Sequence, residues 1–61
     1  MTITRITKDH YLLECCKEIF HIHRASDGVS WVVHNEALKV YHVADDLAEA
    51  VDFIDYIMLI S

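Results

Sequence analysis

The sequence lacks proline, has one glycine and carries two cysteines among its 61 residues. Without a glycine-rich segment it cannot form the loops that hold phosphate groups. Two cysteines are too few for the disulfide framework of a small secreted domain, and a bridge between the adjacent Cys15 and Cys16 would be strained. We therefore expect two reduced thiols, at least one of them buried as a small apolar side chain. With no proline-rich or low-complexity linker, residues 1–61 should form a single domain.

Long apolar runs are missing too. The longest uninterrupted run, residues 56–60, is far shorter than the roughly 20 residues that a membrane-spanning helix needs. The N-terminal segment contains Arg5 and Lys8 but no apolar stretch of the kind that follows the charges of an export signal. These absences predict a soluble cytoplasmic protein that makes no membrane contact.

Basic residues are absent from the part of the chain where acidic residues gather. Residues 1–43 contain five acidic and five basic residues, so the formal charge of −5 arises entirely from residues 44–61. Direct binding of nucleic acid needs clustered Lys and Arg side chains that displace counterions from phosphates, and the sequence has no such cluster. Charge that is confined to one end of a chain favours an interaction surface instead.

Apolar residues, in contrast, are abundant. They make up 54% of the chain, and this content excludes a disordered protein. A domain of this length buries only about 60% of the surface that its unfolded chain exposes, so it is marginally stable without a disulfide, a metal or a partner. The surplus of apolar residues therefore favours a homodimer or a tightly bound partner.

Short runs of β-branched and aromatic residues predict strands over the first two thirds of the chain. Alternation places these strands at about residues 2–7, 11–16, 18–24 and 29–34. Residues 25–28, with the sequence ASDG, are the strongest turn signal, because Asp-Gly accepts the positive φ of a hairpin turn. Residues 38–43 suit either a short fifth strand or an extended lead into the next element.

One amphipathic helix is predicted at about residues 45–59. Asp45 or Asp46 suits the N-cap position, and Glu49 completes a capping pair when Asp46 is the cap. The apolar residues at helical spacing are Leu47, Ala50, Val51, Ile54, Ile57 and Met58. This face should pack on one side of the sheet, which gives a small α+β two-layer sandwich of about four antiparallel strands followed by a C-terminal amphipathic helix.

The opposite face of the predicted helix is acidic and carries no basic residue. Most soluble helices mix charge signs on the wet face, because like charges four residues apart repel. One interpretation is a solvated surface whose acids cap the helix. The other is a docking surface for a basic partner, with spaced carboxylates that imitate nucleic-acid phosphates and aromatic residues at its margin. The candidate partner-binding residues are Asp45, Glu49, Asp52, Asp55, Phe53 and Tyr56.

Histidine is unusually frequent, with five in 61 residues. His21 and His23 alternate on one predicted strand, so their rings leave the same face, and His34 approaches them if the third and fourth strands form a hairpin. Three imidazoles on one face suit zinc, but no complete metal motif accompanies them, and we predict no metal and no cofactor. A merely exposed histidine-rich face and a pH-dependent partner interface are the alternatives.

No catalytic constellation is apparent. A nucleophilic Cys15 or Cys16 would need an orienting group and a formed pocket, for which so small a domain has little room. We predict a non-enzymatic binding module, an inhibitor of phage or mobile-element type (anti-CRISPR or anti-restriction) that binds a basic nucleic-acid-handling protein through its acidic helix. One alternative is an obligate homodimer or a subunit of a larger assembly, with an interface formed by Phe53, Leu59, Ile60 or Trp31. The other is a histidine-based metal-binding or pH-sensing module.

Overall fold

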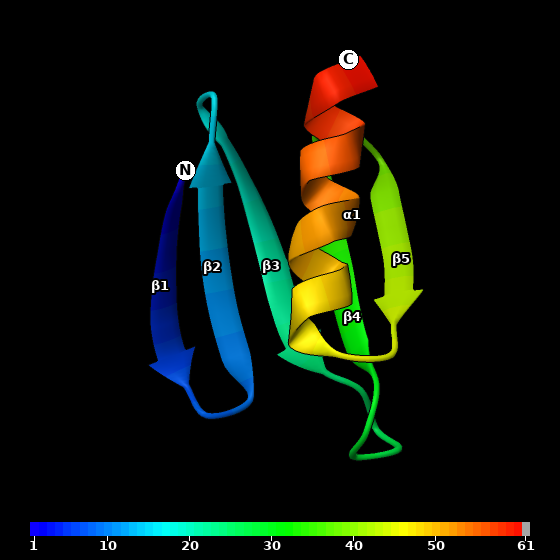
Figure 1. Cartoon of the computed structure of the whole chain (residues 1–61). Coiled ribbons are helices and arrows are strands. Elements are labelled where there is room, and N and C mark those ends of the chain that lie inside the picture. Colours follow the sequence, from blue (N-terminus) through cyan, green and yellow to red (C-terminus); the bar gives the residue numbers. More distant parts are fainter. Residues whose placement is uncertain (61) are drawn as a thin grey trace.

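The computed structural model describes residues 1–60 and shows one antiparallel sheet followed by one helix (Figure 1). The sheet order β1-β2-β3-β4-β5 follows the chain, so each strand pairs with its sequence neighbour. The α+β prediction is confirmed, with five strands in place of about four. The elements are β1 (Thr2–Thr7), β2 (His10–Cys15), β3 (Glu18–Arg24), β4 (Trp31–Asn35), β5 (Val40–Ala44) and α1 (Leu47–Ile60).

Residues 38–43, for which the sequence leaves a strand or an extended lead open, contribute to the fifth strand. β5 pairs with β4 from Asn35 opposite Val40 to Trp31 opposite Ala44. The connection between them is tight, because Asn35 Oδ1 accepts the Leu38 N–H at 2.8 Å and Lys39 adopts a positive φ of 55°. β4 therefore becomes a central strand, paired on both sides.

The loop between β3 and β4 shows why β4 begins later than predicted. Asp27 Oδ1 accepts the N–H groups of Val29 and Ser30, each at 2.8 Å, and Gly28 has a φ of 77°. These bonds hold Val29 in the turn, where its side chain is 68% exposed. The predicted placement of Val29 in the strand was therefore wrong, because the Asp27 carboxylate competes for its backbone N–H.

The β2–β3 hairpin has a two-residue loop of unusual composition. Its residues, Cys16 and Lys17, have φ values of 54° and 70°. Positive φ at both loop positions is typical of the type I′ turn, which matches the twist of the paired strands and favours Asn-Gly. A side chain with a Cβ is strained in this region of backbone conformation. The predicted second strand included Cys16, which the structure instead places in the turn.

Replacing this loop with its preferred residues should stabilise the protein. The double substitution Cys16→Asn, Lys17→Gly is expected to raise the free energy of unfolding by about 1–2 kcal/mol, since it relieves left-handed strain. Urea denaturation followed by circular dichroism measures the change. Lys8→Gly is the control, because Lys8 lies in the β1–β2 turn with no positive φ. A double variant no more stable than Lys8→Gly would show that the loop is unstrained.

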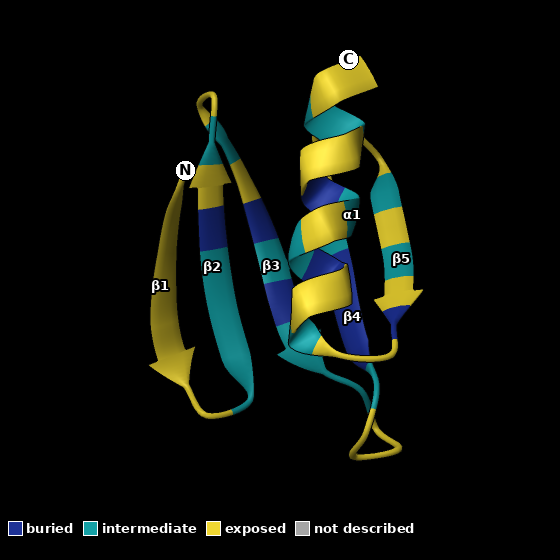
Figure 2. Cartoon of the chain, viewed as in Figure 1, coloured by how far each residue is buried: buried dark blue, intermediate teal, exposed yellow. Residues whose placement is uncertain are grey.

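α1 packs on one face of the sheet, mainly over β4 and β5, and leaves β1 and β2 largely uncovered (Figure 1). Ala50 and Ile54, on the face of α1 that contacts the sheet, are fully buried, as the helical spacing predicts. The other main core residues come from the helix-facing side of the sheet and are Leu13, Phe20, Ile22, Trp31, Val33 and Ala44. Figure 2 shows this buried strip along β3, β4 and the inner side of α1, whereas β1 is exposed throughout.

Trp31 belongs to the core, with only 7% of its surface exposed. Its indole meets Tyr11 edge-on at 5.7 Å, and the Arg24 guanidinium carbon lies 4.4 Å from its ring centroid. Arg24 Nε in turn donates to Asp9 Oδ1 at 2.8 Å. Trp31 is thus enclosed by neighbours within the chain, and the suggestion that it lies in a partner interface is wrong.

Within residues 1–60, α1 is the single helix, and its 14 residues are too few to cross a membrane.

Candidate functional site

The exposed face of α1 carries the predicted acidic surface. Asp45, Glu49, Asp52, Asp55 and Tyr56 are all exposed, and neither α1 nor the segment that leads into it contains a basic residue. Among residues 1–60 the structure shows one ion pair, Arg24 with Asp9, which lies in the sheet layer. The carboxylates of α1 therefore have no cationic partner within the described chain.

Two of the acids at the start of the helix have a structural role. Asp46 Oδ1 accepts the Glu49 N–H at 2.8 Å, as the predicted cap requires, and Glu49 Oε2 accepts the Asp45 N–H at 2.9 Å. Carboxylates here also interact favourably with the positive end of the helix dipole. Because Glu49 is turned back toward the helix start, the carboxylates that project freely from later turns are those of Asp52 and Asp55.

Phe53, which the sequence assigns to the partner-binding face, lies on the side of α1 that faces β5. Its ring stacks on His42 of β5, with centroids 3.9 Å apart and planes 7° apart, and it packs against the hydrophobic core. Tyr56 remains 58% exposed beside the acids, and Leu59 is 83% exposed one turn further on. The aromatic margin of the acidic surface is therefore Tyr56, with Phe53 partly covered beneath it.

The second cluster of functional side chains lies on the sheet face opposite α1. His21 and His23 of β3 alternate with the buried Phe20 and Ile22, so they point away from the helix. The register places His34 of β4 directly opposite His21, which confirms that the three predicted histidines share one face.

A fourth histidine, which sequence reasoning missed, joins this group. His10 of β2 pairs with His23, and His10 Nε2 lies 3.4 Å from His21 Nδ1. The two-residue loop between β2 and β3 determines this pairing. The predicted strands, at 11–16 and 18–24, left a loop of one residue and so did not place His10 opposite His23. We call His10, His21, His23 and His34 the histidine cluster. His42, the fifth histidine, lies on the helix side against Phe53.

The rings of the histidine cluster are in close contact. His21 and His34 are stacked, with centroids 4.9 Å apart and planes at 10°, and His34 meets His23 at 5.3 Å. Burial and the adjacent imidazoles of His21 and His23 lower the pKa of His34 below its ordinary value, although Glu36 opposes the shift. This shift favours the neutral form of His34, in which one ring nitrogen carries a lone pair.

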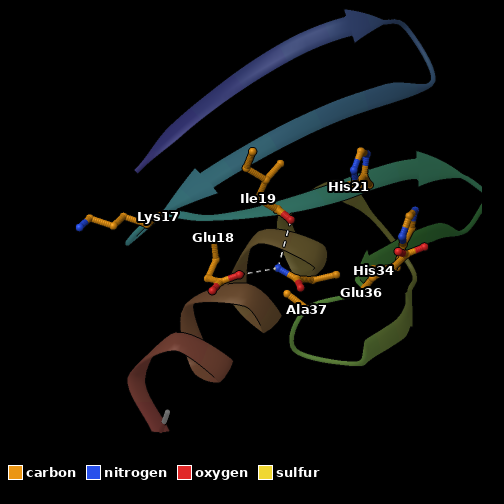
Figure 3. A pocket seen from close by; sticks show the side chains of 8 residues that line it. Lys17, Glu18, Ile19, His21, His34, Glu36 and Ala37 are labelled. Carbon is orange, nitrogen blue, oxygen red and sulfur yellow. Dashed lines mark hydrogen bonds between the residues drawn. The ribbon is translucent and has the colours of Figure 1, made fainter.

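Two open depressions meet at His34. One, of about 430 Å³, is bordered by His21 on β3 and by Lys17 and Glu36 in the flanking turns (Figure 3). The other, of about 550 Å³, is bordered by His23, Lys39 and Tyr41. Asn35 borders both depressions. Its side-chain Nδ2 donates to the Ile19 carbonyl at 3.1 Å and to Glu18 Oε1 at 3.3 Å. Both depressions are open surface features rather than enclosed cavities.

The two thiols lie at the end of β2, with Sγ atoms 3.7 Å apart, and both are free. Cys15 is half-buried against the core, whereas Cys16 is exposed in the turn. The contact with Cys16 raises the pKa of the Cys15 thiol. A nucleophilic cysteine needs the opposite shift, so the Cys15 thiol has no sign of activation.

In the side-chain arrangement of residues 1–60, no group of three or more His, Cys, Asp or Glu residues is placed to hold a metal ion. The structure thus presents two surfaces, an acidic helix face and a histidine-bearing sheet face, on opposite sides of the molecule. Comparison of the chain with protein families, with curated proteins and with solved structures found no match.

Proposed function

We propose that the protein is a non-enzymatic, cytoplasmic binding module whose acidic helix face docks on a basic surface of a nucleic-acid-handling protein. In this role it acts as an inhibitor of the phage or mobile-element type, anti-CRISPR or anti-restriction, by occupying the groove that nucleic acid would fill. The observation that carries the proposal is the exposed run of acids on α1 with no ion-pair partner in residues 1–60.

The spacing of the acids supports recognition of a basic groove. With a rise of 1.5 Å per residue, the carboxylates of Glu49, Asp52 and Asp55 are distributed over about 9 Å of helix, or about one charge per 4.5 Å, and Asp45 precedes the helix. One strand of DNA carries a phosphate per about 3.4 Å of its axis. The helix is thus somewhat less densely charged than a nucleic-acid strand, but it presents the same sign along a similar line.

Reversing the charge at two of these positions should abolish binding and leave the fold intact. Neither Asp52 nor Asp55 takes part in the helix cap, and lysine is a good helix former in the interior of a helix. The double variant Asp52→Lys, Asp55→Lys is expected to recover no basic nucleic-acid-binding protein from host lysate, whereas the wild type does. A pulldown read by mass spectrometry makes the comparison, and circular dichroism checks the fold.

A matched control separates the helix face from net charge alone. Glu14→Lys, Glu36→Lys changes the formal charge by the same amount, and both side chains are exposed outside the helix. This control should recover the same partner as the wild type. Identical recoveries from the wild type and from the Asp52, Asp55 variant would identify the acidic face as a solvated surface and reject the proposal.

The exposed apolar side chains support a second candidate, an obligate homodimer or a subunit of a larger assembly. Leu59 and Ile60 are 83% and 60% exposed at the end of α1, and Ile3 and Ile6 are about half exposed on the edge strand β1. Interfaces of permanent assemblies bury such residues. Sedimentation velocity at micromolar concentration distinguishes the two functions, because a monomer there contradicts an obligate dimer.

A further inference from the structure

The closest contact in the histidine cluster has the geometry of a chelate. Zinc binds imidazole nitrogens at about 2.0–2.1 Å in tetrahedral sites, which places two ligand nitrogens about 3.3–3.4 Å apart. The separation of 3.4 Å between His10 Nε2 and His21 Nδ1 equals this bite. It is also long for an N–H···N hydrogen bond, so the contact itself stabilises the pair weakly.

His23 can supply a third nitrogen, Nε2, to the same ion. His23 is the cross-strand partner of His10 and lies two residues from His21 on the same strand face. Its Nδ1 is 3.4 Å from the carbonyl oxygen of Arg24. A carbonyl accepts but does not donate, so it favours a proton on Nδ1 and leaves Nε2 with the lone pair that a metal needs.

The surroundings also suit a cation. The rings leave an uncovered sheet face, so an ion can reach them, and two lysines, Lys17 and Lys39, border the flanking depressions. Imidazole nitrogens select zinc, copper or nickel over magnesium and calcium, which prefer oxygen ligands.

We propose that the open sheet face is a binding site for a borderline divalent metal such as Zn²⁺, held by His10 Nε2 and His21 Nδ1 and completed by His23 Nε2. In the described arrangement the three lone pairs do not converge on one point, so binding requires the imidazole rings to rotate, together with the tautomers that carry a proton on His10 Nδ1 and His21 Nε2. Solvent fills the remaining position. The site does not depend on the acidic helix face or on its partner.

Titration of the whole chain with ZnCl₂ tests the site. Isothermal titration calorimetry at pH 7.5 should show one Zn²⁺ per chain, and magnesium should show none. His10→Gln and His21→Gln should each weaken binding about tenfold or more, since even an outer-shell partner of a metal ligand is worth 10–100-fold in affinity. These residues lie on the uncovered face, and circular dichroism will confirm that the variants fold.

Two controls identify the ligands. His42→Gln removes the histidine on the helix side and should bind Zn²⁺ as the wild type does. Cys15→Ser, Cys16→Ser removes the two thiols, which lie at the opposite end of β2 from His10, and should also leave the affinity unchanged. Binding that survives His10→Gln and His21→Gln, that is lost with the two serines, or that is absent from the wild type would overturn the proposal.

Discussion

Ile54→Ala is expected to remove most of the stability of the fold. Ile54 is the one large side chain of α1 that is fully buried, and it joins the helix to the core of the sheet. Truncating a buried isoleucine costs about 2–5 kcal/mol through lost burial and the cavity left behind. A 61-residue domain has roughly 3–9 kcal/mol in total at typical stability per residue.

Urea denaturation followed by circular dichroism measures this loss. Leu59→Ala is the matched control, because Leu59 lies on the same helix but is 83% exposed, and its truncation should change stability by less than about 0.5 kcal/mol. Equal effects of the two substitutions would mean that α1 does not pack on the sheet through Ile54.

Asn35→Asp is expected to be nearly as damaging, although it preserves the shape of the side chain. Asn35 is the one buried polar residue of the described chain, at 4% exposed. Its amide donates to the Ile19 carbonyl and to Glu18 Oε1, while its Oδ1 accepts the Leu38 N–H. A carboxylate retains the acceptor but has no donor, so it turns two attractive contacts into repulsion between oxygens. We expect a loss of about 3 kcal/mol or more at pH 7.

The loss should depend on pH. Burial and the Glu18 carboxylate raise the pKa of the introduced carboxyl group in the folded state, so its protonation favours folding and the deficit shrinks as the pH falls toward 4. Denaturant midpoints at pH 7 and pH 4.5, for the wild type and the variant, measure the difference. Adding Glu18→Gln should recover part of the loss at pH 7. A deficit that is independent of pH and of Glu18 would show that packing, rather than charge, makes Asn35 necessary.

Elements whose signals are local could be predicted well. The strands at 2–7 and 18–24 have the predicted bounds, and Asp46 caps the helix as its spacing from Glu49 indicates. The buried positions Ala50 and Ile54 follow from helical periodicity alone. Each of these features depends on residues that lie within a few positions of one another. A pattern within one segment is therefore enough to predict it.

Features that depend on the register between strands were less predictable. The pairing of His10 with His23 follows from a loop in which Cys16 and Lys17 adopt positive φ, a conformation that neither residue type signals. The place of Phe53 depends on β5, because His42 covers its ring. Neither contact can be obtained from the periodicity of one segment.

The fold class, the helix with its apolar and acidic faces, and the confinement of net negative charge to the last part of the chain all follow from the residues read along the chain. The completion of the sheet by β5 and the meeting of four imidazoles on the face opposite α1 depend instead on contacts between segments. The two groups differ because their interactions act over different ranges. Hydrogen bonding and periodicity within a segment act over a few residues, whereas cross-strand neighbours are set by loop geometry and by the burial of the whole sheet.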